Sequence, residues 1–186
     1  MTLFEYLAIA FSLVLSFSAM RLVAGLPYVT QKAERYWVHL VFVFSQLLVT
    51  VVAFWNLWGF REAMWTLPRF VLVLTIPGAI YFGACTLIPN EPSSVDSWRA
   101  HYYVMRQRFF MAILATIVAI SFSLAVVSEL PWLHVARLPQ AAGAGVALLG
   151  IFSADARVHS GLALLLLVVL LVSASSVFLE PGSVTP

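Results

Sequence analysis

The sequence predicts an all-α integral membrane protein, a bundle of six transmembrane helices. The first reason is composition: 62% of the residues are hydrophobic and only 10% are charged, whereas a soluble domain has roughly 25% charged residues. The second is that most of the chain lies in stretches without a formally charged side chain. These are residues 6–20, 38–60, 70–90, 109–128, 138–154 and 158–179. Because they are apolar on every face, they fit helices and not the alternating strands of a membrane β-barrel.

The length of each stretch sets the predicted spans. A helix needs about 20 residues to cross a hydrocarbon core about 30 Å thick. Four of the stretches reach that length as they stand, and the first reaches it once Glu5 and Arg21 are included near its ends. We therefore place the spans at about residues 3–24, 38–60, 67–89, 107–128, 138–154 and 160–179, within one polytopic membrane domain of residues 1–186.

The first three spans have features that support or shape them. Span 1 lacks the basic start and the small-residue cleavage site of a signal peptide, so we expect it to be retained. Span 2 is bordered by Trp37 and Trp58, and such rings gather at the level of the lipid headgroups. Span 3 carries Pro77 and Gly78 at its middle, and we expect a kink there because proline removes a helical hydrogen bond.

The approach to span 4 has its own pattern. Ser93 is placed to cap a helix, and Trp98, Tyr102 and Phe109 recur at helical spacing after it. A short interfacial helix is therefore predicted to lie before span 4 and to run into it.

Spans 5 and 6 are predicted from signals of different strength. Span 5 has only 17 residues and contains Pro139 and three glycines, so the alternative is a bundle of five spans in which 138–154 is a re-entrant segment. Span 6 contains the wholly apolar run 162–171.

The basic residues predict an orientation. With six spans, one side of the membrane receives seven of them and the other side three. The larger set is Arg21, Lys32, Arg35, Arg99, Arg106, Arg108 and Arg157, and the smaller set is Arg61, Arg69 and Arg137. The positive-inside rule makes the first side cytoplasmic. Both termini would then be periplasmic, in a bacterial inner membrane suggested by nine arginines against one lysine.

Small and polar residues recur at three- to four-residue spacing along several spans, and two hypotheses account for them. They allow close helix packing, or they line a path for a polar solute near spans 1–4, with the break at Pro77 as its hinge. The candidate path residues are Glu5, Ser12, Ser16, Gln46, Thr50, Asn56, Pro77, Gly78, Thr116 and Ser123. We favour packing for the stripes, and for Glu5 a position that complements the helix dipole.

Other candidate sites lie at the predicted cytoplasmic boundary. His39, His101 and His159 fall on that side and are the candidates for a metal site, although their spacing matches no known metal motif. A second candidate site, for the headgroups of anionic lipids, consists of Lys32, Arg35, Arg99, Arg106 and Arg108. No catalytic residue, metal or cofactor is predicted.

Several function classes are disfavoured. The only lysine, Lys32, lies in a loop, so a retinal Schiff base has no anchor within a span. The chain has no nucleophile elbow, phosphate loop or CxxC pair, and its formal charge of +2 does not suggest nucleic acid.

The sequence favours a non-catalytic multi-pass protein, a structural or accessory subunit that packs against partner membrane proteins or against itself. A small-solute or ion transporter or channel is the first alternative, and a lipid-handling membrane enzyme is the second.

Overall fold

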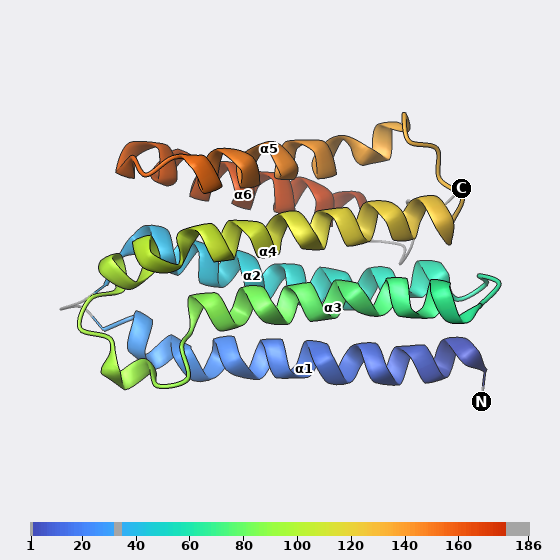
Figure 1. Ribbon diagram of the computed structural model, residues 1–186, viewed down its shortest axis with the longest axis horizontal. Helices are drawn as coiled ribbons and strands as arrows, with labels where there is room; N and C mark the ends of the chain where they lie inside the picture. The colour runs from blue at the N-terminus through green and yellow to red at the C-terminus, as the bar shows by residue number, and fades with distance from the viewer. Residues whose placement is uncertain (1, 32–34, 178–186) are drawn as a thin grey trace.

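Six α-helices run side by side in the computed structural model, which describes residues 2–31 and 35–177 (Figure 1). They are α1 (Leu3–Val29), α2 (Trp37–Asn56), α3 (Leu67–Leu87), α4 (Trp98–Val126), α5 (Leu138–Phe152) and α6 (Ala156–Val177). Three short 3₁₀ turns accompany them: η1 (Leu57–Phe60), η2 (Pro92–Ser94) and η3 (Val135–Arg137). In the described part of the chain six helices are long and apolar enough to cross a membrane. The all-α, six-helix prediction is confirmed, and the structure favours it over the five-span alternative.

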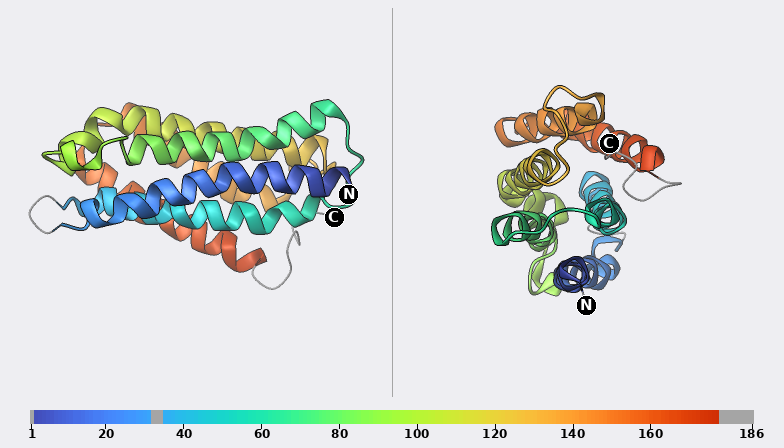
Figure 2. Two further views of the ribbon diagram at one scale, coloured as in Figure 1. Left: turned by 90° about the horizontal axis from the view of Figure 1, so that it is seen from below. Right: turned by 90° about the vertical axis from the view of Figure 1, so that its right-hand side faces the viewer.

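The helices form a ring around the long axis of the bundle. Its order is α1, α3, α4, α5, α6 and α2, with α2 returning to α1, and α2 also packs against α3 across the middle. The view down the bundle in Figure 2 shows α1 and α5 farthest apart, with α6 beside α5. The contact between α2 and α3 therefore divides the ring into two parts. The smaller part consists of α1, α2 and α3, and the wider part consists of α2, α3, α4, α5 and α6.

The two ends of the bundle differ in charge. We call one the arginine-rich end, where α4 and α6 begin and Arg35, Arg99, Arg106 and Arg157 lie. At the opposite end α1 begins and α6 ends, as Figure 1 shows on its right. The buried apolar residues form two cores, one toward each end of the bundle. One surrounds Phe42 and Tyr102 toward the arginine-rich end, and the other lies toward the opposite end.

Two helices extend beyond the predicted spans. Span 1 was placed up to residue 24, but α1 continues to Val29 with Pro27 in its last turn. Span 4 was placed from residue 107, after a short interfacial helix capped by Ser93 and running into it; the structure has one continuous helix, α4, which begins at Trp98 with Ser97 as its cap. The physical reason is that arginines do not end a helix. They mark where it leaves the lipid, and the 29 residues of α4 span about 43 Å, more than the hydrocarbon core.

The ends of the last two spans also differ from the prediction. Helix α5 ends at Phe152 and not at residue 154, and α6 begins at Ala156 and not at residue 160. Residues 178 and 179, which the prediction included in span 6, lie outside the described residues.

Glycine lets α5 lie close to α4. A Cβ atom added at Gly150 would lie 2.5 Å from three ring carbons of Phe110, which is fully buried. At Gly145, five residues earlier on the same helix, an added Cβ would meet nothing within 4 Å. Gly150 is therefore required for this close approach, whereas Gly145 is not.

Candidate functional site

A cavity of about 230 Å³ lies between α2, α4, α5 and α6, in the half of the bundle nearer the opposite end. Along α2 its wall runs from Ser45, near the middle of the span, to Gly59 and Phe60 at its end. Fourteen residues of helix correspond to about 21 Å. The cavity thus extends from the middle of the membrane-spanning region to its boundary.

Most of the wall is apolar. Valine, isoleucine and leucine side chains such as Val52, Ile117 and Val169 form its middle section. Uncharged polar side chains lie at two levels: Ser45, Gln46 and Thr116 at the deep level, and Asn56, Gln140 and Ser173 at the boundary level. None of the described residues lining the cavity is charged.

The polar side chains of the wall fall into two groups. Some have partners within the bundle: Gln46 Nε2 donates to Ile80 O at 2.9 Å, and Gln140 Oε1 accepts from Ser121 Oγ at 3.2 Å. Others do not. Ser45 is 1% exposed, and its Oγ has no hydrogen-bond partner among the residues that the structure describes.

Asn56 Oδ1, at the boundary level, is also buried and lacks a donor from the described residues. An unpaired polar group in an apolar region costs about 1–3 kcal/mol. Both atoms have almost no accessible surface, so they are buried against neighbouring side chains and are not open to the cavity.

The structure brings together only part of the predicted solute path. Gln46, Asn56 and Thr116 line the cavity, and the other seven candidates do not. The hydroxyls of Ser12, Ser16 and Thr50 each donate to the carbonyl four residues earlier, as packed membrane helices do.

The remaining path candidates lie apart from the cavity. Thr2 and Glu5 form a reciprocal capping box at the start of α1, which agrees with the helix-dipole interpretation. Pro77 is buried inside the continuous helix α3, whereas Gly78 faces outward and an added Cβ there would meet nothing. Ser123 is fully buried and does not line the cavity.

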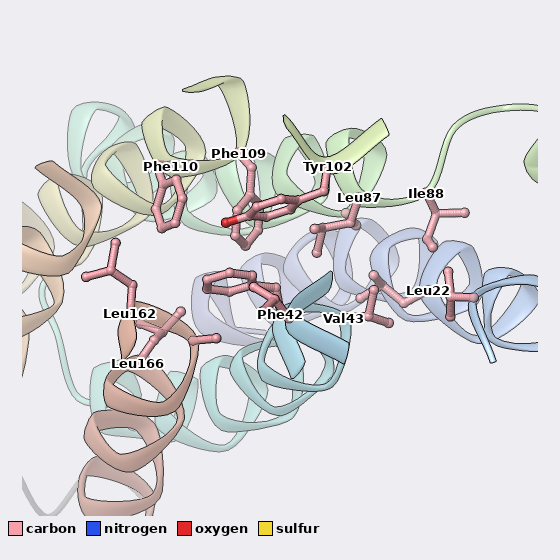
Figure 3. Packing of buried hydrophobic residues seen from close by; sticks show 14 of the residues in the cluster. Leu22, Phe42, Val43, Leu87, Ile88, Tyr102, Phe109, Phe110, Leu162 and Leu166 are labelled. Atoms are coloured by element: carbon pink, nitrogen blue, oxygen red, sulfur yellow. The ribbon is translucent and has the colours of Figure 1, made fainter. Parts of the chain in front are cut away.

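A second buried cluster of polar and aromatic residues lies at the arginine-rich end. Figure 3 shows Phe42, Tyr102, Phe109 and Phe110 packed together. The rings of Phe42 and Tyr102 stack with centroids 5.6 Å apart, and His39 stacks on Trp98 at 5.1 Å. We call these residues, together with His159 of α6, the aromatic cluster; it joins α2, α4 and α6.

Hydrogen bonds within the aromatic cluster determine the state of one histidine. The Nε2 atom of His159 lies 3.0 Å from Ser153 O, which can only accept, so Nε2 carries the proton. The Nδ1 atom of His159 then accepts from the Tyr102 hydroxyl at 2.7 Å. Arg106 Nε donates to the same Ser153 carbonyl at 3.2 Å. This network fixes the turn between α5 and α6.

The three candidate metal ligands do lie near one another, around Tyr102. The ring centroids of His39 and His101 are 6.0 Å apart, and His159 lies 5.4 Å from Tyr102. However, His101 Nε2 bonds Thr86 O at 3.2 Å and His159 uses both nitrogens. Within the described ranges no group of three or more histidine, cysteine or acidic residues could hold a metal ion. His39 stacks on Trp98, and both of its ring nitrogens are buried without a hydrogen-bond partner among the described residues.

The residues predicted to bind lipid headgroups differ in their exposure. Arg35, Arg99 and Arg108 are exposed, whereas Arg106 is half-buried and bonded to main-chain carbonyls; Lys32 lies outside the described residues. At this end the hydroxyls of Tyr36 and Tyr103 are 3.3 Å apart. Burial and that hydrogen bond raise the pKa of Tyr36 well above its usual value.

Arg137 has a different environment, because it is 7% exposed at the opposite end. Its guanidinium donates to the carbonyls of Pro131, Ser121 and Leu130 at 2.8, 3.0 and 2.7 Å. It also lies 4.7 Å from the ring of Trp132. This side chain therefore holds the α4–α5 connection in place.

The sequence analysis did not include three of the polar residues that line the cavity: Ser45, Gln140 and Ser173. Each is a polar residue within a charge-free stretch, and that was the available signal. What the sequence did not show was the rotation of each helix about its axis, which decides whether such a residue faces a neighbour, a cavity or lipid.

The comparisons with known proteins give no name to this fold or site. No family model matches the chain, and neither the curated proteins nor the solved structures contain a match.

Proposed function

We propose that this chain is a non-catalytic membrane protein that binds an apolar molecule, taken from the bilayer, in the cavity between α2, α4, α5 and α6. The observation that carries the proposal is the cavity itself, which has a volume of about 230 Å³, is apolar at its middle and has no charged side chain among the described residues that line it. An apolar cavity of about 150 Å³ holds benzene. By proportion, this one accommodates roughly nine non-hydrogen atoms.

The apolar wall distinguishes this function from ion conduction. Filters that select ions are built from rings of backbone carbonyls or charged side chains. Here valine, isoleucine and leucine separate the deep polar level from the boundary level. Transport of a polar solute and packing against a partner or a second copy stay predictions from the sequence.

Photolabelling in lipid nanodiscs tests the proposal. An eight-carbon alkane that carries a diazirine should label the cavity wall, and the labelling should saturate. Val52→Phe on α2 and Val169→Phe on α6 each fill the cavity and should abolish that labelling. The matched controls are the neighbouring Val51→Phe and Val168→Phe, whose side chains are 65% and 54% exposed on the outer face. Equal, non-saturating labelling of all four variants would refute the proposal.

For location, we propose a bacterial inner membrane with the arginine-rich end in the cytoplasm and both termini in the periplasm. The support is the excess of basic residues at that end. In a Cys85→Ser background, a single cysteine introduced at Thr2 should react with a maleimide that cannot cross the inner membrane, whereas one introduced at Gln31 should react only after that membrane is permeabilised. The reverse pattern of reaction would invert the orientation.

A further inference from the structure

We infer that the molecule in the cavity is one hydrocarbon chain of a membrane phospholipid, which enters sideways between α2 and α6 while its headgroup stays at the membrane surface. This inference rests on the proposed function and specifies its ligand. Three features support it: the place where α6 leaves the bundle, the depth of the cavity and the character of the cavity wall.

Helix α6 packs against the bundle core only in its first half. Near the arginine-rich end Leu162, Ala163 and Leu166 of α6 are buried in the core around Phe42. The core toward the opposite end, as far as the structure describes the chain, contains no residue of α5 or α6. Figure 2 shows the second half of α6 diverging from α2. Helices α2 and α6 therefore separate along the half of the bundle that holds the cavity.

Exposure along these two helices places an opening of the cavity between them. On α2 the lining residue Ser45 is buried, whereas Val52, nearer the opposite end, is half-buried. On α6 the lining residue Leu166 is buried, whereas Val169 is half-buried. The cavity is not fully enclosed. Because Val52 and Val169 lie within helices long and apolar enough to cross a membrane, the opening faces lipid chains and not water.

The depth of the cavity matches one leaflet of the bilayer. Half of a hydrocarbon core of about 30 Å is about 15 Å, and the cavity extends from the middle of the membrane-spanning region to its boundary. A chain from a lipid in the leaflet at the opposite end covers the same depth. The volume of about 230 Å³ holds roughly nine non-hydrogen atoms, which is a section of such a chain. The rest of the lipid therefore stays in the bilayer beside α6.

The cavity wall favours a hydrocarbon chain over a headgroup. Its middle section is formed by valine, isoleucine and leucine, and no lining side chain in the described ranges carries a charge. The polar side chains of Gln46, Thr116 and Gln140 have hydrogen-bond partners within the bundle. A phosphate in the cavity would lose its hydration without gaining a counter-ion. A hydrocarbon chain instead supplies the dispersion contacts that the wall of an empty cavity lacks.

Phospholipid photolabels in nanodiscs test the inference. The probe is a phosphatidylcholine with a diazirine near the methyl end of one chain, and the labelled residues are identified by mass spectrometry. Ile117 of α4 lines the cavity, whereas the next residue, Val118, is 46% exposed on the outer face. The probe should label both residues. Val169→Phe, at the opening, should abolish labelling of Ile117 and leave that of Val118 unchanged, and the outward-facing control Val168→Phe should change neither.

Two outcomes would contradict the position of the lipid. Persistent labelling of Ile117 in the Val169→Phe protein would rule out entry between α2 and α6. A second phosphatidylcholine, with its diazirine beside the ester, should leave Ile117 unlabelled. Equal labelling of Ile117 by both phospholipids would mean that the headgroup enters the cavity, against the inference.

Comparison with the eight-carbon alkane separates the two proposals. If the alkane labels Ile117 and the phospholipid does not, the lipid chain is refuted while the proposed function stands. Labelling by a free fatty acid of the same chain, without labelling by the phospholipid, would equally reject the phospholipid as the source of the chain. If neither the alkane nor the phospholipid labels Ile117, the proposed function itself fails.

Discussion

Replacing Gly150 by alanine should destabilise the bundle, because a Cβ atom there would lie 2.5 Å from three ring carbons of Phe110. The ring has little freedom to move away. It is fully buried, with the centroids of Phe42 and Phe109 both 5.4 Å from its own and that of His159 at 5.6 Å. Overpacking of this kind costs about 1–3 kcal/mol.

The same helix offers a matched control in Gly145→Ala, where the added methyl group meets nothing within 4 Å. Alanine is a better helix former than glycine by up to about 1 kcal/mol, so this variant should be as stable as the parent or slightly more stable. Because the same gain applies to Gly150→Ala, it cancels, and the difference in unfolding free energy between the two variants should be the overpacking cost of about 1–3 kcal/mol.

Titration with sodium dodecyl sulfate in mixed micelles, followed by far-ultraviolet circular dichroism, measures that difference. A smaller side chain at the neighbouring position should restore stability, so Phe110→Leu combined with Gly150→Ala should cost less than the sum of the two single changes. Equal stability of the Gly150→Ala and Gly145→Ala proteins would refute the close packing of α5 on α4.

Three further changes test other parts of the structure in the same titration. Arg137→Met leaves three carbonyls without their donor and should cost about 2 kcal/mol or more; Arg137→Lys should recover only part of it, since an ammonium lacks the planar fork. Tyr102→Phe removes the donor to His159 Nδ1 and should cost about 1–3 kcal/mol; a smaller loss than for Tyr103→Phe would contradict the network. Burial raises the pKa of Tyr36. The free energy that this side chain contributes to folding is therefore complete below a pH of about 10 and falls as the pH rises further. Between about pH 8 and about pH 11, the parent protein should lose more unfolding free energy than the Tyr36→Phe protein does.

The number and type of the helices could be predicted from the sequence because the bilayer imposes a simple requirement. A charge-free stretch of sufficient length has to satisfy its own backbone hydrogen bonds, and only a helix does so within one segment. The helix ends were less accessible. Arg99, Arg106 and Arg108 ended the charge-free stretch but not α4, since their side chains can reach water from within a helix.

The cavity could not be predicted, because it depends on how helices far apart in the chain face one another. Gln46 and Thr50 lie one turn apart on α2, yet only Gln46 lines the cavity. The bond from Tyr102 to His159 joins residues 57 positions apart, and no local pattern indicates such a pair. A spacing rule places side chains on one face of a helix; the direction of that face is decided by packing.

The short length of α5 has a consequence for the surrounding lipid. Its 15 residues measure about 22 Å, against a hydrocarbon thickness of about 30 Å in a typical bilayer. Lipids beside α5 must compress, or the helix must draw headgroups inward, and each ångström of such mismatch has a free-energy cost. The bilayer should therefore be thinner beside α5 than beside the other five helices, each of which has 20 or more residues.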